Sequence, residues 1–353
     1  MEEREMSVGM FIHPHSTLPY NKLLADSLKQ EVNLKLLEVL SKKWVSEDSS
    51  ALDIVHFQWT IGFFDASKKL QQWKQVLAFI YFLFLLRKKG CKIVWTVHNI
   101  HPHDRPLFPY YLGNMFLAHL ADAIIVHAES ASKEVKQWYG LSKKIVVIPY
   151  TTYQGYSKIY TPNYSKVKAR RELRLPENKF IYLFFGYIRK YKGVDIIIKA
   201  FQKKRPKNSI LLIAGGYWSN KERKEIEKLV GNDPDIILHT EEIIGKSVQQ
   251  HMAAADVVVL PYRKITTSGV LVLALTFGKP IIAVKKGMLP EWVSEKNGIL
   301  VEREQDLETA LHEIQKKDLK AMEAASYKLS QEYPWSRIAQ LYRGVYKKVL
   351  RRE

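Results

Sequence analysis

Short apolar runs of the kind that form buried parallel strands alternate with helical segments in the first 150 residues of the chain. These runs are SVGMFI, DIVHFQW, KIVWTVHN, DAIIVHA and KIVVIPY. Strands that alternate with crossover helices indicate a parallel sheet with helices on both of its faces. The first part of the chain is therefore predicted to be a doubly wound α/β domain.

A second alternation of the same kind follows, with the runs FIYLFFGYI, SILLIAGG, DIILHT, DVVVLPY, PIIAV and GILV. Between the two lies Thr151 to Lys179, which is polar, rich in tyrosine and basic residues, and without strand periodicity, as expected of a linker and domain entry. The pattern predicts two Rossmann-like domains that face a cleft, residues 1–160 and 161–334. The amphipathic segment 335–353 is predicted to be a C-terminal helix that packs back on the N-terminal domain.

Composition adds a strong positive charge to this picture. The 353 residues suffice for two domains, and 55 Lys and Arg against 36 Asp and Glu give a net charge of +19. This charge favours nucleic acid, anionic lipid or phosphorylated small molecules as partners. Because no recognisable nucleic-acid-binding module accompanies the charge, nucleic acid is not expected.

The cysteine count and the N-terminus favour a location inside the cell. Cys91 is the single cysteine, so it forms no intrachain disulfide, which is typical of a reducing compartment. The N-terminal residues are charged from the second position and lack the apolar stretch of a signal peptide.

The longest apolar run, Val76 to Leu86, is about half as long as a membrane-spanning helix requires. Arg87, Lys88 and Lys89 follow it directly. The run is either a helix whose basic end lies near phosphate headgroups or a core helix with a cationic C-terminal end.

Three loops that follow predicted strands carry candidate phosphate contacts. In FFGYIRKYKGVD, Gly186 lets a ligand approach the backbone, and Arg189 and Lys192 direct two cations to one place at a helix entrance, where cations oppose the helix dipole. An anion between them removes that mismatch. Gly215 and Gly216 follow the next strand, but paired glycines are also routine in tight turns.

The third loop, TTSGVLVLALTFGKP, begins a helix with Thr267, Ser268, Gly269 and Val270. A helix start carries unpaired backbone N–H groups and partial positive charge, and glycine allows a phosphate to come close. Plain N-capping by Ser or Thr is the alternative. Together with Arg189 and Lys192, the phosphate interpretation is favoured.

The motifs FGYIRKYKGVD, AGG, AADVVVLPY, SGVLVLALTFGKPIIAV, GMLPEWV and NGILV resemble the donor-binding domain of GT-B glycosyltransferases close to family 4. DIVHFQW and KIVWTVHNIHPHD in the first half are similar to bacterial exopolysaccharide and lipid-linked-oligosaccharide transferases. The resemblance implies an acceptor-binding N-terminal domain and a C-terminal domain that holds the diphosphate of a nucleotide-sugar. It departs from the family where two glutamates are usual, since Ile265 and Leu273 stand there, while Glu291 matches a further family position.

The segment TVHNIHPHD lies where this family has a histidine near the donor sugar. His98, Asn99, His103 and Asp104 are therefore the catalytic candidates, although Asp104 equally suits a helix cap. Cysteine is absent from this histidine cluster, and the resemblance implies a metal-independent site, so no metal or other cofactor is expected.

Further residues are assigned to the acceptor side or to the core. His13, His15, Tyr20 and Asn21 follow the first strand and are candidate acceptor contacts, while Asp65 is a base for an inverting reaction or an N-cap. His56 and Trp59 are interpreted as core residues.

These observations predict a transferase that moves a sugar from a GDP- or UDP-sugar to a glycolipid, polyprenyl-linked or polysaccharide acceptor. It is expected to be cytoplasmic and peripheral at the inner face of the cell membrane, in contact with anionic lipid. A sugar-nucleotide epimerase or hydrolase of the same fold, and a noncatalytic donor-binding subunit, are the alternatives.

Overall fold

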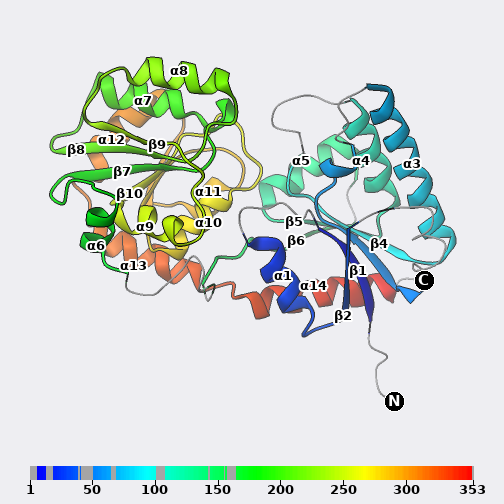
Figure 1. Ribbon diagram of the computed structural model, residues 1–353. Coiled ribbons are helices and arrows are strands. Elements are labelled where there is room, and N and C mark those ends of the chain that lie inside the picture. The colour runs from blue at the N-terminus through cyan, green and yellow to red at the C-terminus, as the bar shows by residue number, and fades with distance from the viewer. Residues whose placement is uncertain are drawn as a thin grey trace. The chain divides into compact units, whose positions relative to one another are not determined.

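The computed structural model describes residues 6–12, 19–38, 40, 51–64, 69–100, 108–141, 144–154, 156 and 164–351. Contacts divide the chain into two compact units, Met1–Tyr150 with Pro334–Glu353, and Thr151–Tyr333. The expected division at residue 160 thus falls ten residues earlier in the contact pattern, directly after Tyr150. Figure 1 shows the elements of each unit.

The first unit is built on a parallel six-stranded sheet in the order β2-β1-β3-β4-β5-β6. Its strands are β1 (Ser7–Phe11), β2 (Asn33–Leu37), β3 (Ile54–Phe57), β4 (Lys92–Thr96), β5 (Ala123–Val126) and β6 (Ile145–Val147). Its helices are α1 (Tyr20–Leu28), α3 (Lys69–Lys88), α4 (Phe108–Leu120), α5 (Glu129–Tyr139) and α14 (Trp335–Leu350), with a 3-10 turn η2 (Ile61–Phe63). All four residues of β3 and all four of β5 are buried, as expected of strands covered on both faces, which explains their mainly apolar sequence.

The second unit has a parallel six-stranded sheet of its own, in the order β12-β11-β10-β7-β8-β9. Its strands are β7 (Phe180–Phe185), β8 (Ser209–Ala214), β9 (Ile236–His239), β10 (Val257–Leu260), β11 (Ile281–Val284) and β12 (Gly298–Val301). Its helices are α6 (Lys166–Glu172), α7 (Val194–Lys203), α8 (Asn220–Val230), α9 (Lys246–Ala254), α10 (Gly269–Thr276), α11 (Leu289–Trp292), α12 (Leu307–Ile314) and α13 (Leu319–Ser330), with 3-10 turns η3 (Lys190–Lys192) and η4 (Glu304–Asp306). Two parallel α/β sheets confirm the predicted fold class.

One strand of the first sheet was not predicted. β2 pairs with β1 at the edge of the sheet and has only one buried residue, Leu37. Because an edge strand with an exposed Lys35 lacks the apolar run of its neighbours, its sequence does not stand out from a loop.

The C-terminal helix belongs to the first unit. In Figure 1, α14, drawn in red, lies beside the blue α1, and the two helices are in contact. The Tyr346 hydroxyl is hydrogen-bonded to His56 Nδ1 at 2.7 Å, which ties α14 to β3 across 290 positions of sequence.

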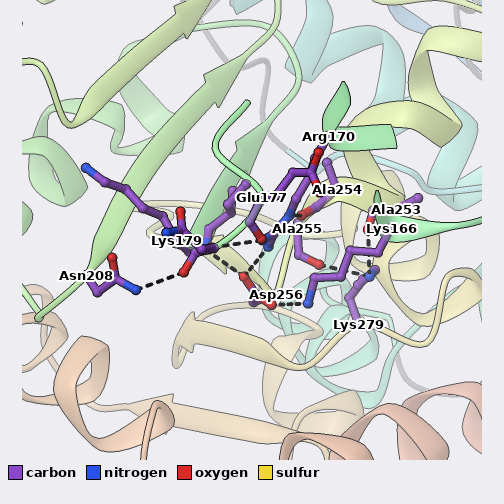
Figure 2. A network of polar contacts seen from close by, with 12 residues as sticks. Lys166, Arg170, Glu177, Lys179, Asn208, Ala253, Ala254, Ala255, Asp256 and Lys279 are labelled. Atoms are coloured by element: carbon purple, nitrogen blue, oxygen red, sulfur yellow. Dashed lines mark hydrogen bonds and ion pairs between the residues drawn. The ribbon is translucent and has the colours of Figure 1, made fainter. Parts of the chain in front are cut away.

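A buried polar network holds the amino ends of β7 and β10 (Figure 2). Asp256 accepts from Arg170 Nη2 at 2.7 Å and from the Ile181 backbone N–H at 2.6 Å, and it also pairs with Lys166. Arg170 and Lys166 come from α6, which lies within the stretch predicted to be a linker. That stretch therefore includes a helix that is bonded into the core of the second unit.

Lys279 enters the same region beside the C-terminal end of α9. Its ammonium is buried and donates to the Ala255 carbonyl at 2.9 Å, and burial lowers the pKa of Lys279 to about 8.

Among the described residues, no helix combines the length and the apolar character needed to cross a bilayer.

Candidate functional site

The loop after β7 brings Lys192 to the start of α10. Gly186 has φ +99°, and a Cβ added there would lie 2.8 Å from Lys192 Nζ and 3.5 Å from Val270 Cγ2. Only glycine leaves room for the ammonium here and adopts this backbone conformation without strain. Three predicted phosphate contacts, Gly186, Lys192 and Val270, are therefore neighbours in the structure.

Two cations lie close together in this loop. Burial, followed by the charge of Arg189, lowers the pKa of Lys192 to about 8. The Arg189 guanidinium lies 3.4 Å from the ring centroid of Trp218, so an aromatic face positions it. A bound anion would relieve the repulsion that the two cations experience.

The start of α10 carries the partial positive charge of a helix N-terminus. The helix has no acidic residue in its first turn, and Ser268 caps it by accepting from the Leu271 N–H at 3.1 Å. The Ser268 N–H itself points to Met288 Sδ at 3.0 Å. The predicted N-cap is therefore present, and Thr267 and Gly269 are half-buried at the same turn, where a phosphate is also proposed to bind.

An ion pair that the sequence interpretation missed joins these two loops. Arg263 forms two hydrogen bonds of 2.7 Å with Asp195, in the first turn of α7, and donates to the Lys190 carbonyl at 2.8 Å. The Arg263 N–H also donates to the Tyr191 carbonyl at 2.9 Å. Arg263 therefore holds the loop that carries Arg189 and Lys192 against the segment that leads into α10.

The other predicted donor contacts have different surroundings. Gly215 has φ +142°, and any Cβ there would clash with the backbone of Gly186, so this glycine is required for the close approach of the two loops. Gly216 is half-buried beside the Tyr187 ring. Glu291 is exposed on the short helix α11. Leu273, at the position where the family usually has a glutamate, is fully buried.

In the first unit His98 is part of the interior. It is 2% exposed, its Nε2 donates to Gln58 Oε1 at 2.7 Å, and its ring stacks on Trp59 with centroids 3.9 Å apart. Burial, followed by the nearby His127 and His56, holds the pKa of His98 well below its usual range. His98 is thus a neutral imidazole directly after β4.

The remaining candidates of this unit divide into two groups. The Asn99 carbonyl accepts from the Tyr110 hydroxyl at 2.9 Å, while Tyr20 and Asn21 are buried, and Asn21 Oδ1 accepts from Trp59 Nε1 at 3.1 Å. The predictions for His13, His15, Asp65, His103 and Asp104 lie outside the described residues. In the part of the chain that is described, no group of three or more His, Cys, Asp or Glu is placed to hold a metal ion.

Both halves of the chain match glycosyltransferase families. Residues 179–317 match the family model described as glycosyl transferases group 1, and residues 52–150 match glycosyltransferase family 4. GDP-mannose:glycolipid 4-beta-D-mannosyltransferase from Xanthomonas campestris pv. campestris is 23% identical over 270 residues, which cover 76% of this chain and 70% of that protein. D-inositol 3-phosphate glycosyltransferase from Streptomyces bingchenggensis is 22% identical over 363 residues, 98% of this chain and 77% of that protein.

Solved structures share the fold over nearly the whole chain. HepE from Anabaena, in complex with UDP and glucose, superposes with a TM-score of 0.75 at 17% identity over 97% of this chain and 100% of that chain. WaaG, a glycosyltransferase involved in lipopolysaccharide biosynthesis, gives a TM-score of 0.66 at 14% identity over 96% and 99% of the two chains. With the two family matches and the curated relatives, these likenesses identify the protein as a glycosyltransferase of the GT-B fold that uses a nucleotide-sugar donor.

Proposed function

We propose that the protein transfers a sugar from a GDP- or UDP-sugar to a glycolipid or polyprenyl-linked acceptor, with the donor diphosphate bound by Arg189, Lys192 and the start of α10. The observation that carries this proposal is the placement of Lys192 Nζ against Gly186 and beside Val270. The donor C1–O bond to the diphosphate breaks, an acceptor hydroxyl oxygen bonds to C1, and the hydroxyl proton passes to the released diphosphate. Cations beside the leaving diphosphate stabilise the negative charge that develops on it.

Two cations and a helix start supply the positive charge that a divalent metal supplies in other diphosphate sites, and we propose that the reaction needs no metal. Each of the two donor nucleotides has support, since one relative is named for GDP-mannose and HepE was solved with UDP. A glycolipid acceptor is supported by the name of the Xanthomonas relative.

We propose further that the protein works at the cytoplasmic face of the membrane, bound peripherally through α3 and α4. Large apolar side chains are exposed along α3 at helical spacing, and α4 adds others beside them. This α3–α4 apolar face consists of Leu70, Trp73, Leu77, Tyr81, Phe84, Phe108 and Met115. Trp and Tyr favour the interface between lipid and water, which supports a peripheral contact.

Replacing Lys192 by Ala tests the donor site. Loss of a charge-assisted hydrogen bond worth about 1.5–3 kcal/mol should weaken GDP or UDP binding by roughly 10- to 150-fold in calorimetry. The neighbouring Lys190, which is exposed, provides the control, and Lys190→Ala should retain the parent affinity. Equal affinities for parent and folded Lys192→Ala would place the diphosphate elsewhere.

A further inference from the structure

A cavity of about 460 Å³ lies in the first unit, at the carboxyl ends of β1 and β2 and under α3. Phe11 is the last residue of β1, Trp59 and Phe63 follow β3, and Phe79 comes from the inner face of α3. The volume lies within the roughly 300–1,000 Å³ of small-molecule sites. All residues named in its lining belong to the first unit, whereas the loops that carry Arg189, Lys192 and the start of α10 belong to the second.

Two hydrogen-bond acceptors lie among the aromatic residues that line the cavity. Gln75 Oε1 is buried, and no donor from the described part of the chain reaches it. Glu38, directly after β2, is exposed and adds a carboxylate to the lining. Because a buried carbonyl oxygen without a donor is destabilising, Gln75 indicates a ligand that brings an N–H or O–H group.

The chemistry of the lining selects among possible ligands. A diphosphate offers no strong donor to Gln75 and is repelled by Glu38, and a hydrocarbon chain leaves Gln75 Oε1 unsatisfied. A sugar ring has both features that the wall requires, because its C–H faces pack on aromatic rings and its hydroxyls donate to amide and carboxylate oxygens.

Trp59 connects the cavity with the catalytic candidate. One face of its indole stacks on the His98 ring with an interplanar angle of 8°, and its Nε1 is fixed by Asn21. A ligand in this cavity therefore lies beside the same indole that stacks on His98. We infer that the cavity binds a sugar ring of the acceptor, with Gln75 accepting from one of its hydroxyls, an inference that rests on the proposed transferase function.

Gln75→Leu tests this assignment in two ways. Leucine has nearly the same volume and removes the unsatisfied oxygen, so the unfolding temperature of the ligand-free protein should rise by roughly 2–4 °C. Methyl glycosides of D-glucose, D-mannose and D-galactose serve as probes in saturation-transfer NMR with the full chain. Their binding should weaken about tenfold in Gln75→Leu.

Two further variants complete the experiment. Gln71→Leu makes the same chemical change at an exposed position one turn away and should bind the glycosides as the parent does. Ala78→Phe fills the cavity from α3 and should abolish glycoside binding. Saturation transfer to none of the glycosides, or equal transfer in parent and Gln75→Leu, overturns the inference.

Nucleotide binding separates this inference from the proposed donor site. GDP and UDP added to the same samples should leave the glycoside signals in place. If either nucleotide displaces the glycosides, the sugar occupies the donor pocket and the cavity assignment is wrong. If glycosides bind but neither nucleotide does, the donor proposal fails and the cavity stands.

Discussion

Lys192 is the residue on which the proposed diphosphate site of the second unit depends most. Its ammonium lies against Gly186 and beside Val270, and Arg189 adds a second positive charge to the same loop. Asp195, the acid nearest in sequence, is paired with Arg263 instead. This arrangement is the basis of the proposal that Lys192 binds the donor diphosphate.

The lowered pKa of Lys192 predicts a pH dependence of donor binding. Since this pKa is about 8 in the free protein, Lys192 carries its proton below that pH and loses it above. An anion raises the pKa, so binding above about pH 8 requires proton uptake, and GDP or UDP affinity should fall by up to tenfold per pH unit. Calorimetry in buffers of different ionisation enthalpy measures that uptake. Lys192→Arg stays charged, and its affinity should be constant over the same range.

His98 is predicted to act on the transferred sugar rather than on nucleotide binding. His98→Ala should lower turnover by roughly 100-fold or more while the Kd for GDP or UDP stays within a few-fold of the parent value. His127 belongs to the same buried cluster and is 1% exposed, so His127→Ala is a control with similar loss of packing. Turnover that falls equally in both variants would mean that His98 is only a structural residue.

Among the secondary-structure elements, the residues of the proposed donor site lie where strands end and helices begin. The loops after β7 and β8 meet at Gly186 and Gly215, and Arg263 joins the loop before α10 to the first turn of α7. In the first unit, α3 has apolar residues on two faces: Phe79 is buried in the core, whereas Leu77 is 61% exposed. The apolar residues on the inner side of α3 are thus explained by the core, and those on its outer side by the proposed membrane contact.

The exposed side of α3 predicts binding to anionic bilayers. The double change Trp73→Ser and Leu77→Ser removes two side chains of the α3–α4 apolar face and should reduce sedimentation with anionic liposomes at least tenfold. Lys88 and Lys89 should contribute about 1 kcal/mol each, screened by salt. Arg87 should contribute less, because it is paired with Asp122 at 2.7 Å.

Leu341→Ser, on the exposed side of α14, is the control for this experiment. Parent protein that sediments equally with neutral and anionic liposomes would contradict the electrostatic part of the prediction. Unchanged sedimentation of the double variant would contradict the apolar part.

At the scale of the whole molecule, each unit is closed by contacts between distant parts of the chain. The chain completes the first sheet, builds the second unit and returns with α14 to the first. In the second unit, Asp256 joins α6 to the amino ends of β7 and β10, at the edge of the sheet opposite to the donor loops (Figure 2).

Asp256→Asn should therefore destabilise the second unit without changing its donor site. Removing the charge leaves the buried Arg170 without its carboxylate partner and should lower the free energy of unfolding by about 3–5 kcal/mol. Asp306→Asn breaks an exposed pair with Arg303 and should leave the free energy of unfolding nearly unchanged, because solvent screens such a pair. Denaturant unfolding compares the two, and GDP or UDP affinity should remain at the parent value in both. Similar unfolding curves for the two variants would contradict the role given to Asp256.

Local patterns were sufficient for the strands and the loops that follow them. The six apolar runs of the second unit coincide with β7 to β12, because strands buried on both faces of a parallel sheet require unbroken apolar sequence. Gly186, Lys192 and Val270 were predictable as a group, because parallel strands end at the same edge of a sheet. The pairing of Asp195 with Arg263, the interior position of His98 and the cavity beside Trp59 could be seen only in the folded chain. The contact Asp195–Arg263 joins residues 68 positions apart, and His98 contacts Gln58 and Trp59 across 40 and 39 positions. No local periodicity of the sequence encodes contacts at such separations.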